Sequence, residues 1–193
     1  MPEHAGNIGD RRGRRWRTVA WSSAALLLLL PLVAMQFTDQ FDWTLSDFVI
    51  FAAMLAAVGI AFEVATRKTG NKAYRTAVGV ALGTAFILLW VNGAVGIIGS
   101  ENNPANLMYG GVLVIGIIGA VIARFQPHGM ARAMVATAIA QVAVAVIALV
   151  AGLGPAGVNL LGDVLLLIVF FVALWLVAAW LFRKSGREIT PPL

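Results

Sequence analysis

The sequence contains no cysteine and only two histidines. The absence of cysteine excludes a disulfide framework, thiolate metal sites and thiol redox chemistry. The histidines, His4 in the N-terminal tail and His128 in a short polar turn, are both expected in solvent and leave little material for a zinc or haem site. We therefore predict no cofactor.

Charged residues are also scarce. They make up 12% of the 193 residues, whereas 60% of the residues are hydrophobic. A soluble globular domain carries about twice that share of charge. The composition therefore indicates a membrane protein.

Six apolar segments are long enough to cross a bilayer core of about 30 Å, which takes about 20 helical residues. They lie near residues 17–37, 48–66, 76–98, 104–124, 130–151 and 164–182. In lipid a lone segment satisfies its backbone only as a helix, and no segment shows the alternation of a barrel strand. The predicted fold class is all-α, a polytopic transmembrane bundle of six spans. Asn103 followed by Pro104 is typical of a helix start and is expected to open the fourth span.

The basic residues indicate an orientation. All 14 Lys and Arg residues fall on one side of the six-span arrangement, whereas the opposite loops carry Asp39, Asp42, Asp47, Glu101 and Asp163. Lys and Arg accumulate in cytoplasmic loops. We therefore predict that both termini are cytoplasmic and that the protein is a multi-pass protein of a bacterial cytoplasmic (inner) membrane.

The chain divides into three predicted parts, which are a basic tail over 1–16, a transmembrane domain over 17–183 and a short tail over 184–193. The arginines before the first span and its leucine run also resemble a signal peptide. Leu32, Val33 and Ala34 form a poor small-residue cleavage site, however. We predict that the first span is retained.

Small residues predict which helices pack closely, because close approach drives helix association in lipid. The predicted small-residue faces are Gly79 with Gly83, Gly116 with Ala120, and Ala133, Ala136, Ala140 and Ala143. These faces place the packed centre at spans three, four and five. The sixth span has no such face and is expected to meet lipid or a partner protein.

The most polar segment within the predicted bundle runs from Trp90 to Tyr109. Its candidate ligand or ion-binding residues are Trp90, Asn92, Glu101, Asn102, Asn106 and Tyr109. A carboxylate beside several amides can coordinate a hard cation or bind a polar ligand. The alternative is a capped turn in which Glu101 only keeps the loop in water.

Three further polar residues fall inside predicted spans. Glu63 lies four residues before Arg67, so an ion pair at the cytoplasmic surface is the favoured interpretation. Thr84 and Gln141 lie near mid-span, where polar side chains commonly hydrogen-bond between helices. Trp175, like Trp90, lies away from the interfacial aromatic belt.

Three functions are compatible with these residues. The first is a non-enzymatic accessory or assembly subunit, with the lipid bilayer and a membrane-protein partner or second copy as partners and no nucleic acid. The second is a transporter or channel for a small solute or ion. Its outer vestibule would comprise Asn92, Glu101, Asn106 and Tyr109, with Thr84 and Gln141 deeper. The third is an enzyme acting on lipid through Glu101, which is disfavoured because that carboxylate has no catalytic partner.

Overall fold

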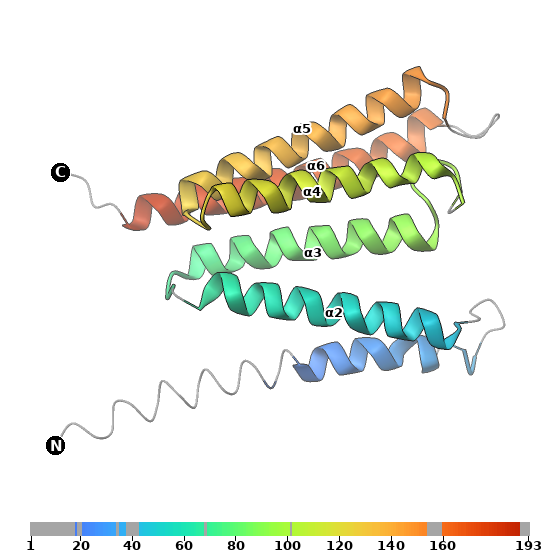
Figure 1. Ribbon diagram of the computed structural model, residues 1–193, viewed down its shortest axis with the longest axis horizontal. Coiled ribbons are helices and arrows are strands. Elements are labelled where there is room, and N and C mark those ends of the chain that lie inside the picture. The colour runs from blue at the N-terminus through green and yellow to red at the C-terminus, as the bar shows by residue number, and fades with distance from the viewer. Residues whose placement is uncertain are drawn as a thin grey trace. The chain divides into compact units, whose positions relative to one another are not determined.

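The computed structural model describes residues 18, 21–33, 35–37, 43–67, 69–100, 102–153 and 160–189, the last range without the side chains of 160–164 and 189. Every regular element in these ranges is helical, which confirms the all-α prediction. In chain order the elements are an apolar helix Trp21–Val33, α2 Leu45–Thr66, α3 Lys72–Ala94, the 3-10 turn η1 Pro104–Asn106, α4 Leu107–Ile122, α5 Pro127–Val150 and α6 Leu160–Ile189 (Figure 1).

Five of the described helices are long and apolar enough to cross a membrane. They correspond to the second to sixth predicted spans, with ends that differ by up to seven residues. The first predicted span contains the helix Trp21–Val33, which at 1.5 Å per residue covers about 20 Å of a bilayer core of about 30 Å. Residues 19, 20 and 34 lie outside the described ranges, so the sixth crossing stays a prediction.

The chain forms two compact units, residues 1–61 and 62–193. In the first unit, α2 begins with a reciprocal cap, in which the backbone N–H and the hydroxyl of Thr44 each donate to Asp47 Oδ2 at 2.8 Å. The Trp21 ring packs on α2 at Gly59, where an added Cβ would lie 3.4 Å from ring atom Cη2. The shorter helix and α2 are therefore in contact within this unit.

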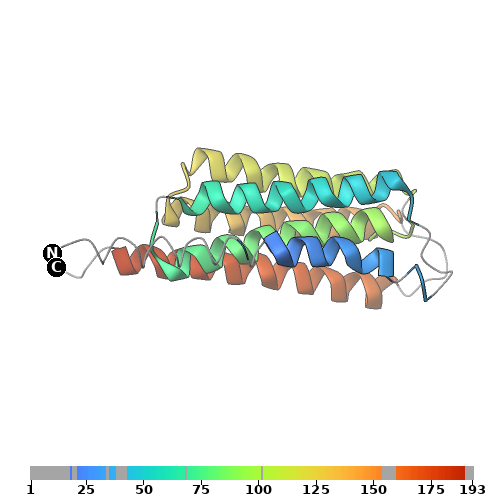
Figure 2. The same ribbon diagram turned by 90° about the horizontal axis from the view of Figure 1, so that it is seen from below.

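The second unit contains α3, α4, α5 and α6. The starts of α3 and α5 and the ends of α4 and α6 lie at one end of this unit (Figures 1 and 2). α6 packs along both α3 and α5, and α4 packs along α5, whereas α3 and α4 contact each other much less. These four helices form an antiparallel bundle, and most residues of its buried core lie on them.

The structure corrects the prediction that the sixth span lacks a packing face, although α6 also exposes apolar side chains such as Leu166 and Val169. One face of α6 is buried in the bundle, comprising Phe171, Trp175, Ala178, Ala179, Phe182 and Ser185. Large side chains fill this interface. The ring of Phe182, for example, packs edge to face on the ring of Tyr74, with 5.2 Å between the ring centroids. These helices therefore pack both by close backbone approach and through large interlocking side chains. The small-residue pattern detects only the first kind of packing.

Of the predicted small-residue face on α4, Gly116 contacts α5, and Gly119, which the prediction did not include, contacts α5 more closely. A Cβ added at Gly119 would lie 2.7 Å from Ala133 Cβ, and one at Gly116 would lie 3.2 Å from Thr137 Oγ1. The other predicted faces hold only in part, because Ala133 is buried and Ala140 is partly buried against the core. Ala136 and Ala143 are exposed, and nothing lies within 4 Å of a Cβ added at Gly83.

The buried stripe of α5 is rotated from the predicted alanine face. Most of its members recur every three or four residues, and they are Met130, Ala131, Ala133, Met134, Thr137, Ala138, Gln141, Val144, Ala145 and Ala148. This spacing keeps one side of a helix against its neighbours. Gln141 therefore lies on the packed side of α5.

The turn between α4 and α5 is tight and strained. Arg124 and Phe125 both adopt left-handed backbone conformations, with φ of 48° and 58°. Such a conformation costs a non-glycine residue about 1–2 kcal/mol. The hydroxyl of Tyr74 in α3 donates a hydrogen bond of 2.6 Å to the Phe125 carbonyl. This bond holds the α4–α5 connection against the N-terminal end of α3.

Candidate functional site

The connection between α3 and α4 folds into the bundle. Ile97 and Ile98 are 4% and 1% exposed, and Asn106 and Tyr109 are 5% and 1% exposed. The backbone turns through Gly96 and Gly99, which have positive φ angles of 74° and 85° that glycine adopts without strain. Much of the predicted Trp90 to Tyr109 region is therefore packed against protein.

Asn106 holds this connection together. Its side-chain Oδ1 accepts from the Ile98 N–H at 2.9 Å, and its Nδ2 donates to the Ser100 carbonyl at 2.6 Å. Its backbone carbonyl accepts from Asn92 Nδ2 in α3 at 3.0 Å. One asparagine thus satisfies two groups of the loop and joins α3 to the start of α4.

Asn103 adds a second set of bonds. As predicted, it caps the turn that Pro104 opens, since its Oδ1 accepts from the Ala105 N–H at 3.0 Å. Its Nδ2 donates to the carbonyls of Ile98 and Leu153, each at 2.8 Å. Because Leu153 follows α5, Asn103 ties the α3–α4 connection to the chain that leads toward α6.

The remaining candidate ligand or ion-binding residues are placed differently. Trp90 is half-buried in α3, and Asn102 is exposed in the loop. Glu101 lies outside the described residues, so its predicted role stays a prediction. The amides of Asn103 and Asn106 are already bonded to backbone groups, which is the arrangement of a structural cap.

Deeper in the bundle, several buried polar atoms have no hydrogen-bond partner among the described residues. They are both amide atoms of Gln141, the Tyr109 hydroxyl, the Trp175 indole nitrogen Nε1 and the Asn92 oxygen Oδ1. The four residues come from α5, α4, α6 and α3. An unpaired buried polar group costs about 1–3 kcal/mol. Such groups normally have a partner in a native structure, and ordered water or a bound molecule can supply it here.

The register of the helices gives the depths of these groups. Gly116 faces Thr137, and one turn along each antiparallel helix brings Val112 level with Gln141. Tyr109 lies three residues further toward the loop end, an axial offset of about 4.5 Å. The polar groups of α4 and α5 thus occupy adjacent levels of the bundle.

The same reasoning places Trp175 and Asn92. Gly186 of α6 faces His128 of α5. Because the two helices are antiparallel, the same number of residues back along α6 and forward along α5 brings residue 173 level with Gln141. Trp175 is two residues from that level, which is about 3 Å along the helix. Asn92 bonds to Asn106, three residues before Tyr109. The unpaired atoms therefore run in depth from the middle of the bundle, at Trp175 and Gln141, past Tyr109 to Asn92 near the loop end.

The threonines at this depth differ from Gln141. Thr84 Oγ1 donates to the Val80 carbonyl at 2.7 Å, and Thr137 Oγ1 donates to the Ala133 carbonyl at 2.9 Å. Each therefore bonds within its own helix, one turn back. Of the predicted mid-span pair, Gln141 rather than Thr84 offers unused hydrogen-bonding capacity.

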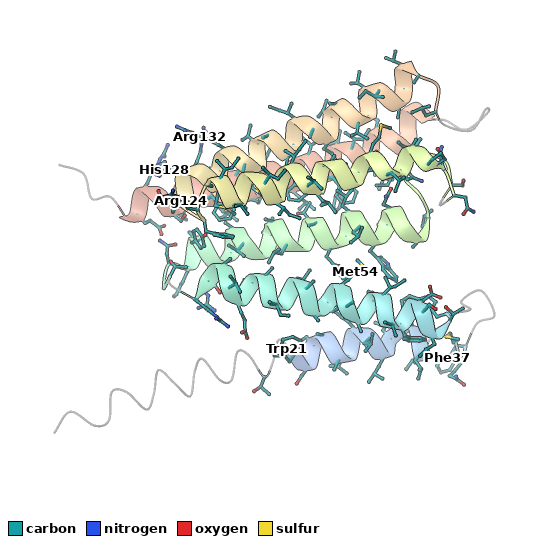
Figure 3. All side chains as sticks on the ribbon, in the orientation of Figure 1. Trp21, Phe37, Met54, Arg124, His128 and Arg132 are labelled. Carbon is teal, nitrogen blue, oxygen red and sulfur yellow. The ribbon has the colours of Figure 1, made fainter. Side chains whose placement is uncertain are left out.

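Charge is segregated to the other end of the second unit. Its described Lys and Arg residues all lie where α3 and α5 begin and α4 and α6 end, and are Arg67, Lys72, Arg75, Arg124, Arg132, Arg183, Lys184 and Arg187. Arg124 and Arg132 are labelled at this end in Figure 3. Glu63 is half-buried in the last turn of α2. Asn71, the cap of α3, donates to Glu188 of α6 at 2.9 Å. The unpaired polar atoms thus lie in the interior and toward the opposite end.

Trp175 is the interior residue that the sequence interpretation did not include among the site candidates. The available signal was its position at mid-span, away from the interfacial belt that suits tryptophan. In the structure it is 3% exposed, with its indole N–H unpaired among the described residues.

No protein-family model, no curated protein and no solved structure matches this chain.

Proposed function

We propose that this chain is a multi-pass membrane protein that admits a small polar solute into the interior of its helical bundle, as a transporter or channel does. The observation that carries the proposal is the set of unpaired polar atoms on α3, α4, α5 and α6. Polar side chains inside a membrane bundle are costly and mark substrate pathways. The solute would meet Asn92 and Tyr109 first and Gln141 with Trp175 at mid-depth.

The proposal includes an orientation. The end of the second unit that carries the described basic residues faces the cytoplasm, since Lys and Arg are retained on that side. The α3–α4 connection then faces outward, and solute enters from that side. The membrane would be the cytoplasmic (inner) membrane of a bacterium.

Cysteine labelling tests the orientation, because the natural chain has no cysteine and each introduced thiol is unique. Asn102 and Gln126 are both exposed and lie in opposite connections. A membrane-impermeant maleimide should label Asn102→Cys in intact cells and Gln126→Cys only after permeabilisation. Labelling in the reverse order would overturn the orientation, and labelling of both in intact cells would overturn the membrane arrangement.

Reconstituted vesicles test the function itself. Purified protein is placed in liposomes, and the influx of urea, acetamide, glycerol, K⁺ and Cl⁻ is followed by light scattering or by ion-sensitive dyes. We expect protein-dependent flux of at least one of these probes above that of protein-free vesicles. If the protein changes the flux of none of them, the transport proposal is wrong.

The accessory or assembly role remains the competing proposal. It is favoured by exposed apolar side chains of α2, among them Val49, Ile50 and Ile60, which lipid or a partner can contact. Native mass spectrometry of protein extracted from its own membrane separates the two. A stoichiometric protein partner together with absent flux would favour the accessory role over transport.

A further inference from the structure

The chemical character of the interior narrows the class of solute. Among the described residues, every buried polar side chain is uncharged, and the set comprises Thr66, Thr84, Asn106, Thr137, Gln141 and Ser185, with the phenol of Tyr109 beside them. Moving an ion into such surroundings leaves its charge uncompensated, which costs far more than burying a neutral polar group. The interior therefore favours a neutral molecule over an ion.

The unpaired atoms include both donors and acceptors. Gln141 offers an N–H₂ group and a carbonyl oxygen on the same amide, Trp175 offers an N–H, and the Tyr109 hydroxyl offers both functions. Asn92 Oδ1 adds an acceptor nearer the loop end. A molecule that only accepts or only donates hydrogen bonds would leave part of this set unpaired.

The geometry of an amide makes Gln141 the selective group. A carboxamide presents its donor and its acceptor side by side in one plane, so a second amide can bond to it through two antiparallel N–H···O bonds. Urea and simple carboxamides carry this complementary pair. Gln141 is 0% exposed and close to the middle of α5, with small Ala138 and Ala145 on the same buried side.

We infer that Gln141 binds a small neutral solute of the amide or urea class at mid-depth in the bundle, with Tyr109 and Trp175 as supporting hydrogen-bonding groups. This inference rests on the proposed transport function and specifies its substrate class. Gln141 is the residue that discriminates, since it alone has both amide atoms unpaired among the described residues.

The test compares Gln141→Leu with Thr137→Val in the same vesicles. Leucine keeps the approximate size of glutamine and removes its amide, whereas Thr137→Val removes a hydroxyl that is already bonded to Ala133, one turn away on the same buried face. We expect Gln141→Leu to lower protein-dependent flux of urea and acetamide about tenfold, the effect expected from the loss of one or two net hydrogen bonds. Thr137→Val should change this flux by less than about twofold, as expected for a substitution outside the solute contacts.

A second readout separates solute binding from a structural role. Without solute, Gln141→Leu should unfold at a higher temperature than the wild type, because an unpaired buried amide is replaced by an apolar side chain. A structural glutamine would give the opposite shift, and a lower unfolding temperature together with lost flux would overturn the inference. Added urea or acetamide is not used in the unfolding experiment, because it would act as a denaturant.

The outcomes also distinguish this inference from the function on which it rests. Flux of K⁺ or Cl⁻ without flux of urea or acetamide would overturn the substrate class and leave transport standing. Amide flux that is unchanged in Gln141→Leu would overturn the role of Gln141 alone. Absence of flux for every probe in the wild-type protein would overturn the transport function and this inference together.

Discussion

Gly119→Ala should destabilise the bundle, although alanine is the better helix former. The added Cβ would lie 2.7 Å from Ala133 Cβ and 3.3 Å from Ala133 Cα, so α4 and α5 would have to separate. Overpacking of this kind costs about 1–3 kcal/mol. The thermal unfolding midpoint in detergent should fall by about 2–4 °C for each kcal/mol in a protein of this size.

The same substitution at Gly111 in α4 provides the matched control. Nothing lies within 4 Å of a Cβ added there, so Gly111→Ala should gain about 1 kcal/mol from helix propensity. The two variants should therefore shift the midpoint in opposite directions. Combining Gly119→Ala with Ala133→Gly should recover part of the loss. Equal midpoints for the two single variants would show that α4 and α5 do not approach as described.

Asn106→Ala should loosen the outer end of the bundle. The substitution removes the acceptor of the Ile98 N–H and the donor to the Ser100 carbonyl. Ile98 is 1% exposed, so water does not readily replace the lost bond. Each buried backbone group left unpaired costs about 1–3 kcal/mol. We expect a lower unfolding midpoint and faster hydrogen exchange at the Ile98 amide.

Two variants sharpen this experiment. Asn102→Ala alters an exposed asparagine four residues away and should change stability by less than about 0.5 kcal/mol. Asn106→Asp keeps an acceptor for the Ile98 N–H but places a carboxylate oxygen toward the Ser100 carbonyl, so it should be at least as damaging as alanine despite its similar shape. Unchanged hydrogen exchange at Ile98 in Asn106→Ala would contradict the role assigned to Asn106.

The helices could be predicted from the sequence because their signal is local. A run of about 20 apolar residues is a direct consequence of bilayer thickness. The Asn103–Pro104 cap is equally local, since both the capping oxygen and the absent proline N–H act within one turn. The segments from Leu45 to Thr66 and from Pro127 to Val150 were accordingly placed within three residues at each end.

The packing could be predicted only in part. The contact between Gly119 and Ala133 joins α4 and α5, two helices that follow one another in the chain and are linked by a short connection. One partner of α6, the helix α3, is distant in sequence, and bulky residues such as Phe171 look alike whether they face lipid or protein. In a membrane, apolar periodicity does not separate the two faces of a helix as it does in water.

The polar site shows the same limit. Gln141 is recognisable in the sequence as a polar residue at mid-span, but its lack of a described partner depends on which side chains of the neighbouring helices approach it. The asparagines were visible as a cluster, yet their use as backbone caps depends on the path of the loop through Gly96 and Gly99. The sequence can therefore identify such polar residues as candidates. Three-dimensional contacts are needed to decide which of them can bind a ligand and which have a structural role.

The position of α6 has a consequence for biogenesis. α3, α4 and α5 leave the ribosome first, yet α3 and α5 both pack on α6, which is made after them. At about 5–20 residues per second, the further residues of α6 take a few seconds to appear. During that interval the faces of α3 and α5 that pack on α6 lack their partner, so the nascent bundle presents these faces to lipid or to the insertion machinery. Truncation before α6 should therefore mark the protein for degradation more strongly than loss of one peripheral span.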